Sequence, residues 1–242
     1  MEAIQVGTGG ESIDEDLIAL INGTMTDFVV PNGVERITSY RFYGLKSLRS
    51  VDLRNLTVEL QGYAFNECSA LETVIMPDSL SLATPLGSRL FLNCISLKKF
   101  EYSGTGTAYS AVSSMFQGCT ALEEVKMPYF SFAGAGAIFN GCTSLRHVDM
   151  LGRIGNNFFN NCAELKTIVI RSSNVGALSN VSAFTGTPFA SGGSGGTIYI
   201  PKALYDELGT GSTNDYKAAT NWSMIDAYGT ITWAQIEGSE YE

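Results

Sequence analysis

The amino-acid sequence predicts a repeat solenoid, with short parallel strands on one face and loops or single helical turns on the other. A motif of the form F-x-x-C-x-x-L-x-x-V-x-M-P begins at Phe116 and returns through most of the chain. Its last two apolar positions lie two residues apart, which is the side-chain period of a β-strand. The two ends depart from the motif, as the capping segments of a stack must. We therefore expect one repeat domain across residues 1–242.

The first element, residues 1–24, is expected to be a helical cap. The stretch from Ser12 to Ile21 has the pattern of a short amphipathic helix. Ser12 is the expected N-cap, and Glu15 stands at the position that completes a capping box. The apolar side chains expected to cover the open end of the stack are Ile13, Leu17, Leu20 and Ile21.

Six complete copies of the motif follow within residues 25–201. They begin at Phe42, Phe65, Phe91, Phe116, Phe139 and Phe159. Three residues later stand Leu45, Cys68, Cys94, Cys119, Cys142 and Cys162. A second inward anchor is expected five residues before some phenylalanines, at Ile37, Leu60, Leu86 and Ile154. The apolar positions keep their register from copy to copy, so they are predicted to point into a common core.

Each copy is expected to end in a short strand. A proline often follows and should end the strand there, because proline cannot donate to a strand ladder. Pro77 and Pro128 stand at this position. The same reasoning identifies a partial unit at each end, one finishing at Pro31 and the other at Pro201. The prediction is therefore eight strands in all.

The last element, residues 202–242, is expected to be a C-terminal cap. Residues 202–208 should be helical, and Trp222 and Trp233 should seal the exposed end of the stack. A platform on which these tryptophans stack against a sugar is the alternative.

Charge and hydropathy exclude two classes of partner. The net charge is −9, and the acidity belongs to the two ends, while residues 36–201 carry 13 basic and 10 acidic side chains. No basic residues cluster on one predicted face, so we expect no nucleic-acid partner. No run of about 18 apolar residues is present, so we expect no membrane insertion. The N-terminus does not have the pattern of a secretory signal.

No residue pattern indicates catalysis, a metal site or a cofactor. The five cysteines share one repeat offset, which predicts buried thiols that pack as small hydrophobic groups rather than a disulfide framework. A bridge between neighbouring rungs is possible by distance, but parallel side-chain directions disfavour it. The one histidine, His147, should point outward from its strand with no nucleophile beside it.

The outward strand positions are the candidate binding residues. Opposite charges should meet on neighbouring strands, with Lys99 beside Glu124 and Glu101 beside Lys126, so much of this charge should be satisfied within the sheet. Ile75, Val169 and Tyr199 are apolar and are the better contact candidates. The full set is Ile75, Lys99, Glu101, Glu124, Lys126, His147, Asp149, Val169 and Tyr199.

The repeated signature resembles the BspA-like class of bacterial leucine-rich repeats over residues 18–201. Residues 199–222 are also similar to the usual ending of such arrays, and residues 17–24 to their lead-in. The resemblance implies a leucine-rich-repeat solenoid with a parallel sheet, displayed outside the cell and used for adhesion or protein contact. The chain departs from the pattern in having no visible signal peptide or anchor, and Leu45 in place of a cysteine.

We therefore expect a non-enzymatic binding or adhesion module that contacts a protein or glycan through the concave sheet. It should be secreted or on the cell surface, monomeric and free of cofactors. The alternative is a structural or receptor-binding component of a larger assembly such as a phage tail, which should form homo-oligomers. An enzyme would need a cleft that perturbs carboxylates such as Glu101 and Glu124.

Overall fold

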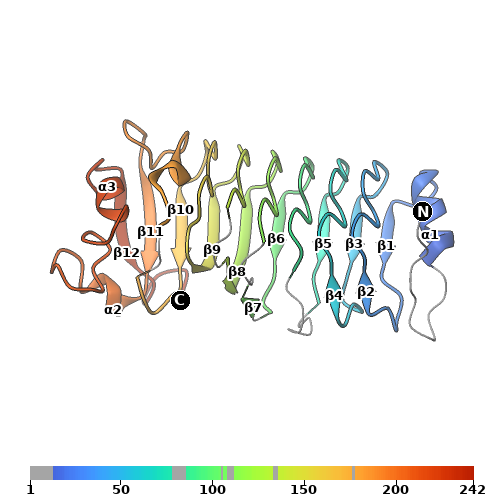
Figure 1. Ribbon diagram of the computed structural model, residues 1–242, viewed down its shortest axis with the longest axis horizontal. Coiled ribbons are helices and arrows are strands. Elements are labelled where there is room, and N and C mark those ends of the chain that lie inside the picture. The colour runs from blue at the N-terminus through green and yellow to red at the C-terminus, as the bar shows by residue number, and fades with distance from the viewer. Residues whose placement is uncertain (1–12, 78–85, 105, 108–111, 133–135, 176–177) are drawn as a thin grey trace.

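The computed structural model describes residues 13–77, 86–104, 106–107, 112–132, 136–175 and 178–242. The chain winds into an elongated solenoid whose strands stand side by side along the long axis (Figure 1). This is the predicted fold. The expected N-cap at Ser12 lies outside the described residues.

Parallel strands follow one another along one side of the stack. The N-terminal group is β1 (Asp27–Val29), β3 (Ser50–Asp52) and β5 (Thr73–Ile75). The larger group, in spatial order, is β6 (Lys99–Glu101), β8 (Glu124–Ser131), β9 (His147–Gly152), β10 (Thr167–Ile170), β11 (Gly196–Ile200) and β12 (Ile231–Gln235). Motif positions pair in register, so Val125 lies opposite Phe100 on one side and Val148 on the other. The described chain thus has nine strands on this side, one more than predicted.

The additional strand is β12. It continues the stack because Trp233 takes the inner position opposite Ile198 of β11, although no F-x-x-C motif precedes it. The expectation that Pro128 ends its strand is wrong, because β8 runs through Pro128. A register irregularity between Met127 and Ser131 accommodates the missing N–H group there.

Short strands form a second line on another side of the stack. β2 (Arg36–Ile37) pairs with β4 (Glu59–Leu60) through Ile37 and Leu60, and β7 (Gly106–Thr107) pairs with the far end of β8. The four predicted second anchors, Ile37, Leu60, Leu86 and Ile154, are all buried. They tie this line of the chain to the same core.

A column of phenylalanines runs through the core. Neighbouring rings from Phe42 to Phe159 stack with centroids 5.1–5.7 Å apart and planes within 10° of parallel. Every ring in the column is fully buried. The motif phenylalanine therefore joins each repeat to the next as well as to its own strand.

The five cysteines form a second column and are free thiols, as predicted. Each Sγ lies 2.9–3.2 Å from the carbonyl oxygen of the phenylalanine one repeat earlier, so each thiol donates a hydrogen bond between repeats. Burial raises the pKa of Cys68 and of Cys119 to about 12, which keeps both thiols protonated. The motif cysteine is thus a donor as well as a small packing group.

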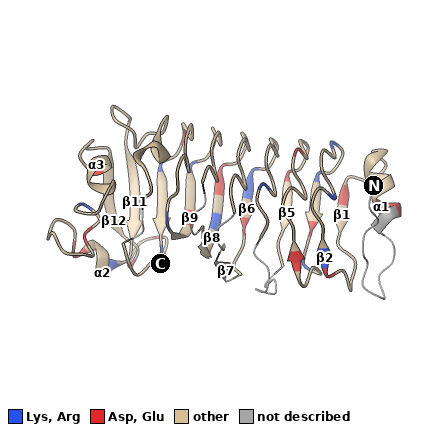
Figure 2. Cartoon of the chain, viewed as in Figure 1, with Lys and Arg blue, Asp and Glu red and all other residues tan. Residues whose placement is uncertain are grey.

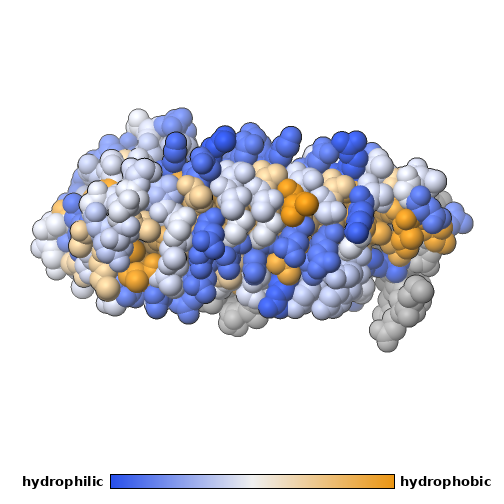
Figure 3. All heavy atoms as spheres, turned by 90° about the horizontal axis from the view of Figure 1, so that it is seen from above, coloured by the Kyte–Doolittle hydropathy of each residue, from blue (hydrophilic) through white to orange (hydrophobic). Residues whose placement is uncertain are grey.

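Caps close both ends. At the N-terminal end, α1 (Ile13–Ile21) buries Leu20, but Ile21 is 63% exposed, so the expectation that Ile21 covers the stack is wrong. Apolar surface is visible at this end of the molecule in Figure 3. The other end follows the 3-10 turn Val181–Phe184 and consists of α2 (Lys202–Tyr205), α3 (Trp222–Asp226) and β12.

Both tryptophans belong to the C-terminal cap. Trp222 is fully buried and packs against Tyr216, while the indole Nε1 of Trp233 donates to Asp226 at 2.6 Å. Burial of Trp222 rules it out as a platform for a sugar, and it seals the end of the stack instead.

Candidate functional site

We call the surface formed by the outward side chains of the long row of strands the strand face. The open half is the part over β1, β3, β5, β6 and β8, and the covered half is the part over β9, β10 and β11. Ile75 in the open half is 42% exposed, whereas Asp149 and Val169 in the covered half are 4% and 0% exposed. Repeats with the same inner packing therefore present different outer surfaces.

Opposite charges alternate on the two central strands of the open half, as predicted (Figure 2). Glu124 forms ion pairs with Lys99 and Lys126, each with a nitrogen–oxygen distance of 3.0 Å. The Nζ of Lys126 also lies 3.9 Å from a carboxylate oxygen of Glu101. Burial of Glu124 opposes its ionisation, but the hydrogen bonds from the two lysines outweigh that effect and lower its pKa. The four charges largely satisfy one another and do not form a site for a charged ligand.

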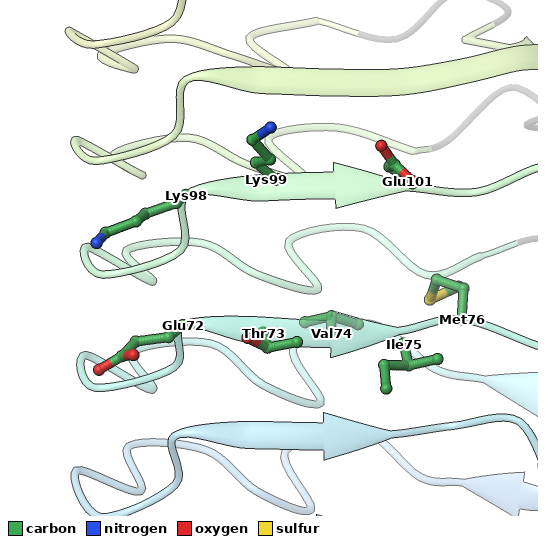
Figure 4. A pocket seen from close by; sticks show the side chains of 8 residues that line it. All are labelled: Glu72, Thr73, Val74, Ile75, Met76, Lys98, Lys99 and Glu101. Atoms are coloured by element: carbon green, nitrogen blue, oxygen red, sulfur yellow. The ribbon is translucent and has the colours of Figure 1, made fainter.

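A groove of about 620 Å³ lies between β5 and β6 (Figure 4). Thr73 and Ile75 border it on the β5 side, and Lys99 and Glu101 on the β6 side. The inner residues Val74 and Met76 also reach it, and they are slightly exposed, at 8% and 7%. Glu72 and Lys98 lie at one end of the groove, and ion pairing draws Lys99 toward β8, so the apolar part of the groove is the stretch beside Val74, Ile75 and Met76.

The groove exists because the strand ladder is broken at this point. Elsewhere the residue at the last apolar position of the motif donates its N–H to a carbonyl oxygen of the next strand. Leu53 donates to Ile75 and Tyr102 donates to Lys126, each at 2.8 Å. The equivalent residue, Met76, makes no such bond, and within the described ranges no backbone hydrogen bond joins β5 to β6. Two strand edges therefore face each other without pairing.

The inner side chains of β6, beside the break, are larger than those of the other repeats, although β6 still pairs with β8 on its other side. Phe100 stands where the other repeats have valine or isoleucine, and Tyr102 where most have methionine, leucine or isoleucine. The ring of Phe100 packs 5.4 Å from Phe91 and 4.8 Å from Phe116. A close-packed core has no room for such added volume without movement of the backbone.

The covered half is covered by the end of the chain itself. Tyr241 stacks on the ring of His147 at 5.0 Å and 13°, and meets Tyr199 edge-on at 4.7 Å. Its ring thus bridges β9 and β11, with β10 between them. Figure 1 places the C-terminus beside these strands, although they lie far from it in the sequence. Burial raises the pKa of Tyr241 to about 12, so the phenol remains neutral.

An ion pair seats this segment. Arg171, directly after β10, donates to both carboxylate oxygens of Asp149, at 2.7 and 2.8 Å. It also donates to the carbonyl oxygen of Tyr241 at 2.8 Å. Asp149 therefore holds Arg171 in place, and Arg171 binds the main chain of the segment.

Four predicted contact residues are consequently not available as open surface. Asp149 is buried in its ion pair, Val169 is buried in the same row of the sheet, and Tyr199 and His147 lie against Tyr241. Both ring nitrogens of His147 are buried without a hydrogen-bond partner. This burial lowers its pKa, and Lys126 adds to the effect, while Glu124, Asp149 and Glu240 oppose it.

No arrangement for catalysis was found in the part of the chain that the structure describes. Within it, no group of three or more His, Cys, Asp or Glu residues could hold a metal ion. Nor does any described helix have the length and apolar character needed to cross a membrane. His147 stacks on a tyrosine, and the thiols are occupied by backbone carbonyls inside the core.

Sequence reasoning identified Ile75, Lys99, Glu101, Glu124 and Lys126, which the open half brings together. It missed the groove. It also missed the packing of the C-terminal segment on β9, β10 and β11, which we call the cover. The unusual Phe100 and Tyr102 were the one available signal for the groove. For the cover, the aromatic Tyr241 near the end of the expected C-terminal cap was a weaker signal.

A comparison with protein-family models agrees with this architecture. The family model described as BspA type Leucine rich repeat region matches six copies over residues 18–133 and 83–189, more than half of the chain. A solved structure of a T. pallidum Leucine Rich Repeat protein is 21% identical and has a TM-score of 0.38, with 57% of this chain and 77% of that chain covered. A leucine-rich repeat protein from Bacteroides ovatus ATCC 8483 is 19% identical with a TM-score of 0.38, covering 86% of this chain and 66% of that chain. A comparison with curated proteins finds no match.

Proposed function

Because the chain belongs to the family of BspA-type leucine-rich repeats, we propose that it is a non-enzymatic module that binds a partner protein through the open half of the strand face. We also propose that the protein is a monomer and that it is secreted or displayed on the cell surface. The observation that carries it is the broken ladder between β5 and β6, beside the exposed Ile75.

A peptide segment that lies over this groove is the ligand that suits it. The Cα atoms of β5 and β6 come within 8 Å of each other, so a further strand cannot insert between them. Free main-chain groups at the two edges can still bind such a segment, and one of its apolar side chains can enter the groove. The Met76 N–H group is unpaired on the β5 edge, and Val74, Ile75 and Met76 supply apolar contact. Saturated sugars lack the repeating amide groups that such edges recognise, so we favour a protein over a glycan.

The test uses linear peptides selected from a random display library against the whole chain. Ile75→Arg should weaken binding of the selected peptides by at least 10-fold, because it places a charge at the apolar border of the groove. The matched control is Ile95→Arg, since Ile95 is 48% exposed but lies outside the strands. Binding that is insensitive to Ile75→Arg, or equally sensitive to Ile95→Arg, would contradict the proposal.

Light scattering of the purified chain tests the monomeric state separately. A single species of one chain, 26.0 kDa, is expected. Stable homo-oligomers would instead favour a component of a larger assembly.

A further inference from the structure

The covered half has the features of a recognition site that the C-terminal segment, residues 237–242, already occupies. We propose that this site binds an aromatic side chain within an acidic peptide segment of a partner, and that the C-terminal segment is a displaceable stand-in for it. The proposal concerns other residues than the groove between β5 and β6, so either can fail without the other.

The contacts of Tyr241 define what the site recognises. Its ring has one face on His147 and meets Tyr199 edge-on, at 5.0 and 4.7 Å. Both arrangements are favourable for aromatic rings and are poorly reproduced by aliphatic side chains. The hydrogen bond from Arg171 to the Tyr241 carbonyl oxygen adds recognition of the main chain. The site therefore reads a peptide that carries an aromatic residue.

The receiving residues are held in place independently of the segment. Asp149 fixes the guanidinium of Arg171 by two hydrogen bonds and is itself almost fully buried. His147 and Tyr199 project from β9 and β11, and each of these strands pairs with β10 between them. A site on a rigid sheet with a positioned arginine remains formed when its occupant leaves.

The segment itself is held by few contacts. Beyond Tyr241, Glu237 accepts from the Lys202 N–H and, through its carbonyl, from Gln235. The N–H and the hydroxyl of Ser239 both donate to the carbonyl oxygen of Ile236, just before the segment. Glu240 and Glu242 are exposed. Both ring nitrogens of His147 are buried beneath the segment without a hydrogen-bond partner. They would regain hydrogen bonds to water if the segment were released. These features describe a contact that a competing ligand can displace.

Charge favours an acidic ligand. The segment carries Glu237, Glu240 and Glu242 and no basic residue. Glu240 acts on His147 in the direction that favours the protonated ring.

The test uses a fluorescent synthetic peptide with the sequence of residues 236–242. It should bind the full-length Tyr241→Ala variant saturably and at least 10-fold more tightly than the wild type, whose site is occupied. The same peptide with alanine for tyrosine should not bind. Ile75→Arg in the same background should leave binding unchanged, which separates this site from the groove.

Carbethoxylation of the one histidine supplies a second readout. His147 should be protected in the wild type, reactive in Tyr241→Ala and protected again when the peptide is added. Tyr228→Ala is the control, because Tyr228 is an exposed tyrosine of the C-terminal cap and the ring that stacks on His147 is that of Tyr241. The proposal is overturned if Tyr241→Ala shows no saturable binding, if the alanine peptide binds equally, or if His147 stays protected in Tyr241→Ala.

Discussion

The open and covered halves of the strand face are built on the same core but present different surfaces. Phe65 below the open half and Phe139 near the covered half are equally buried, and each stacks on a ring before and after it. Phe139 also meets Phe132 and Phe158 edge-on. On the outside, one half has an exposed isoleucine beside unpaired strand edges, and the other has a tyrosine from the chain's own end. The repeat motif thus determines the inner rows, and single departures from it determine what a partner can reach.

The largest expected effect is a loss of stability on removing a core ring. It tests whether the core below the open half and the core below the covered half contribute equally. Phe65→Ala and Phe139→Ala should each lower the free energy of unfolding by about 3–5 kcal/mol, because each removes a fully buried ring from a stacked column. Urea titration followed by circular dichroism measures both. Values that differ between the two variants by more than about 2 kcal/mol would show that the halves are not equivalent inside.

The next effect contrasts an ion pair from each half. Asp149→Ala should destabilise the protein by about 1–3 kcal/mol, because Arg171 keeps its charge without its bidentate partner. Glu101→Ala in the open half should change stability by less than about 0.5 kcal/mol, since its pair with Lys126 is exposed. Equal effects of the two substitutions on the free energy of unfolding would show that the pair of Asp149 with Arg171 stabilises the protein no more than the exposed pair of Glu101 with Lys126.

The smallest expected effect is a dependence of the cover on pH. An uncovered histidine has a pKa of about 6.5, and burial under Tyr241 lowers that of His147. The uncovered state therefore binds more protons, so the cover is most stable above about pH 6.5 and weakens as the pH falls below it. The flanking Glu124, Asp149 and Glu240 oppose this shift, while Lys126 strengthens it.

The His147 ring resonances report this equilibrium directly by NMR. Between pH 7 and 5.5 they should lose the ring-current shift from Tyr241 in the wild type. In His147→Phe the stack remains possible without a titrating group, so Tyr241 resonances should stay unchanged over the same range. Equal loss of the contact in both proteins would assign the effect to the carboxylates instead.

The sequence predicted the inner rows because each rests on a local pattern repeated six times. Phe, Cys, Leu and the strand pair recur at fixed offsets, so any one copy is checked by the others. The cover depends on one contact between residues 94 positions apart, His147 and Tyr241, which no periodicity can indicate. The groove depends on the volume of Phe100 and Tyr102 against neighbouring repeats, which appears only when the repeats are packed.

Amide hydrogen exchange measured by NMR tests whether the strand ladder is broken between β5 and β6. Leu53 and Tyr102 donate their N–H groups across the ladder, whereas Met76, at the same motif position, does not. The Met76 amide should therefore exchange at least about 100-fold faster than those of Leu53 and Tyr102, because exchange there needs no opening of a hydrogen bond. A bound peptide from the display selection should slow it. Equal protection of all three amides would mean that the ladder is continuous, and it would contradict the groove as the binding site.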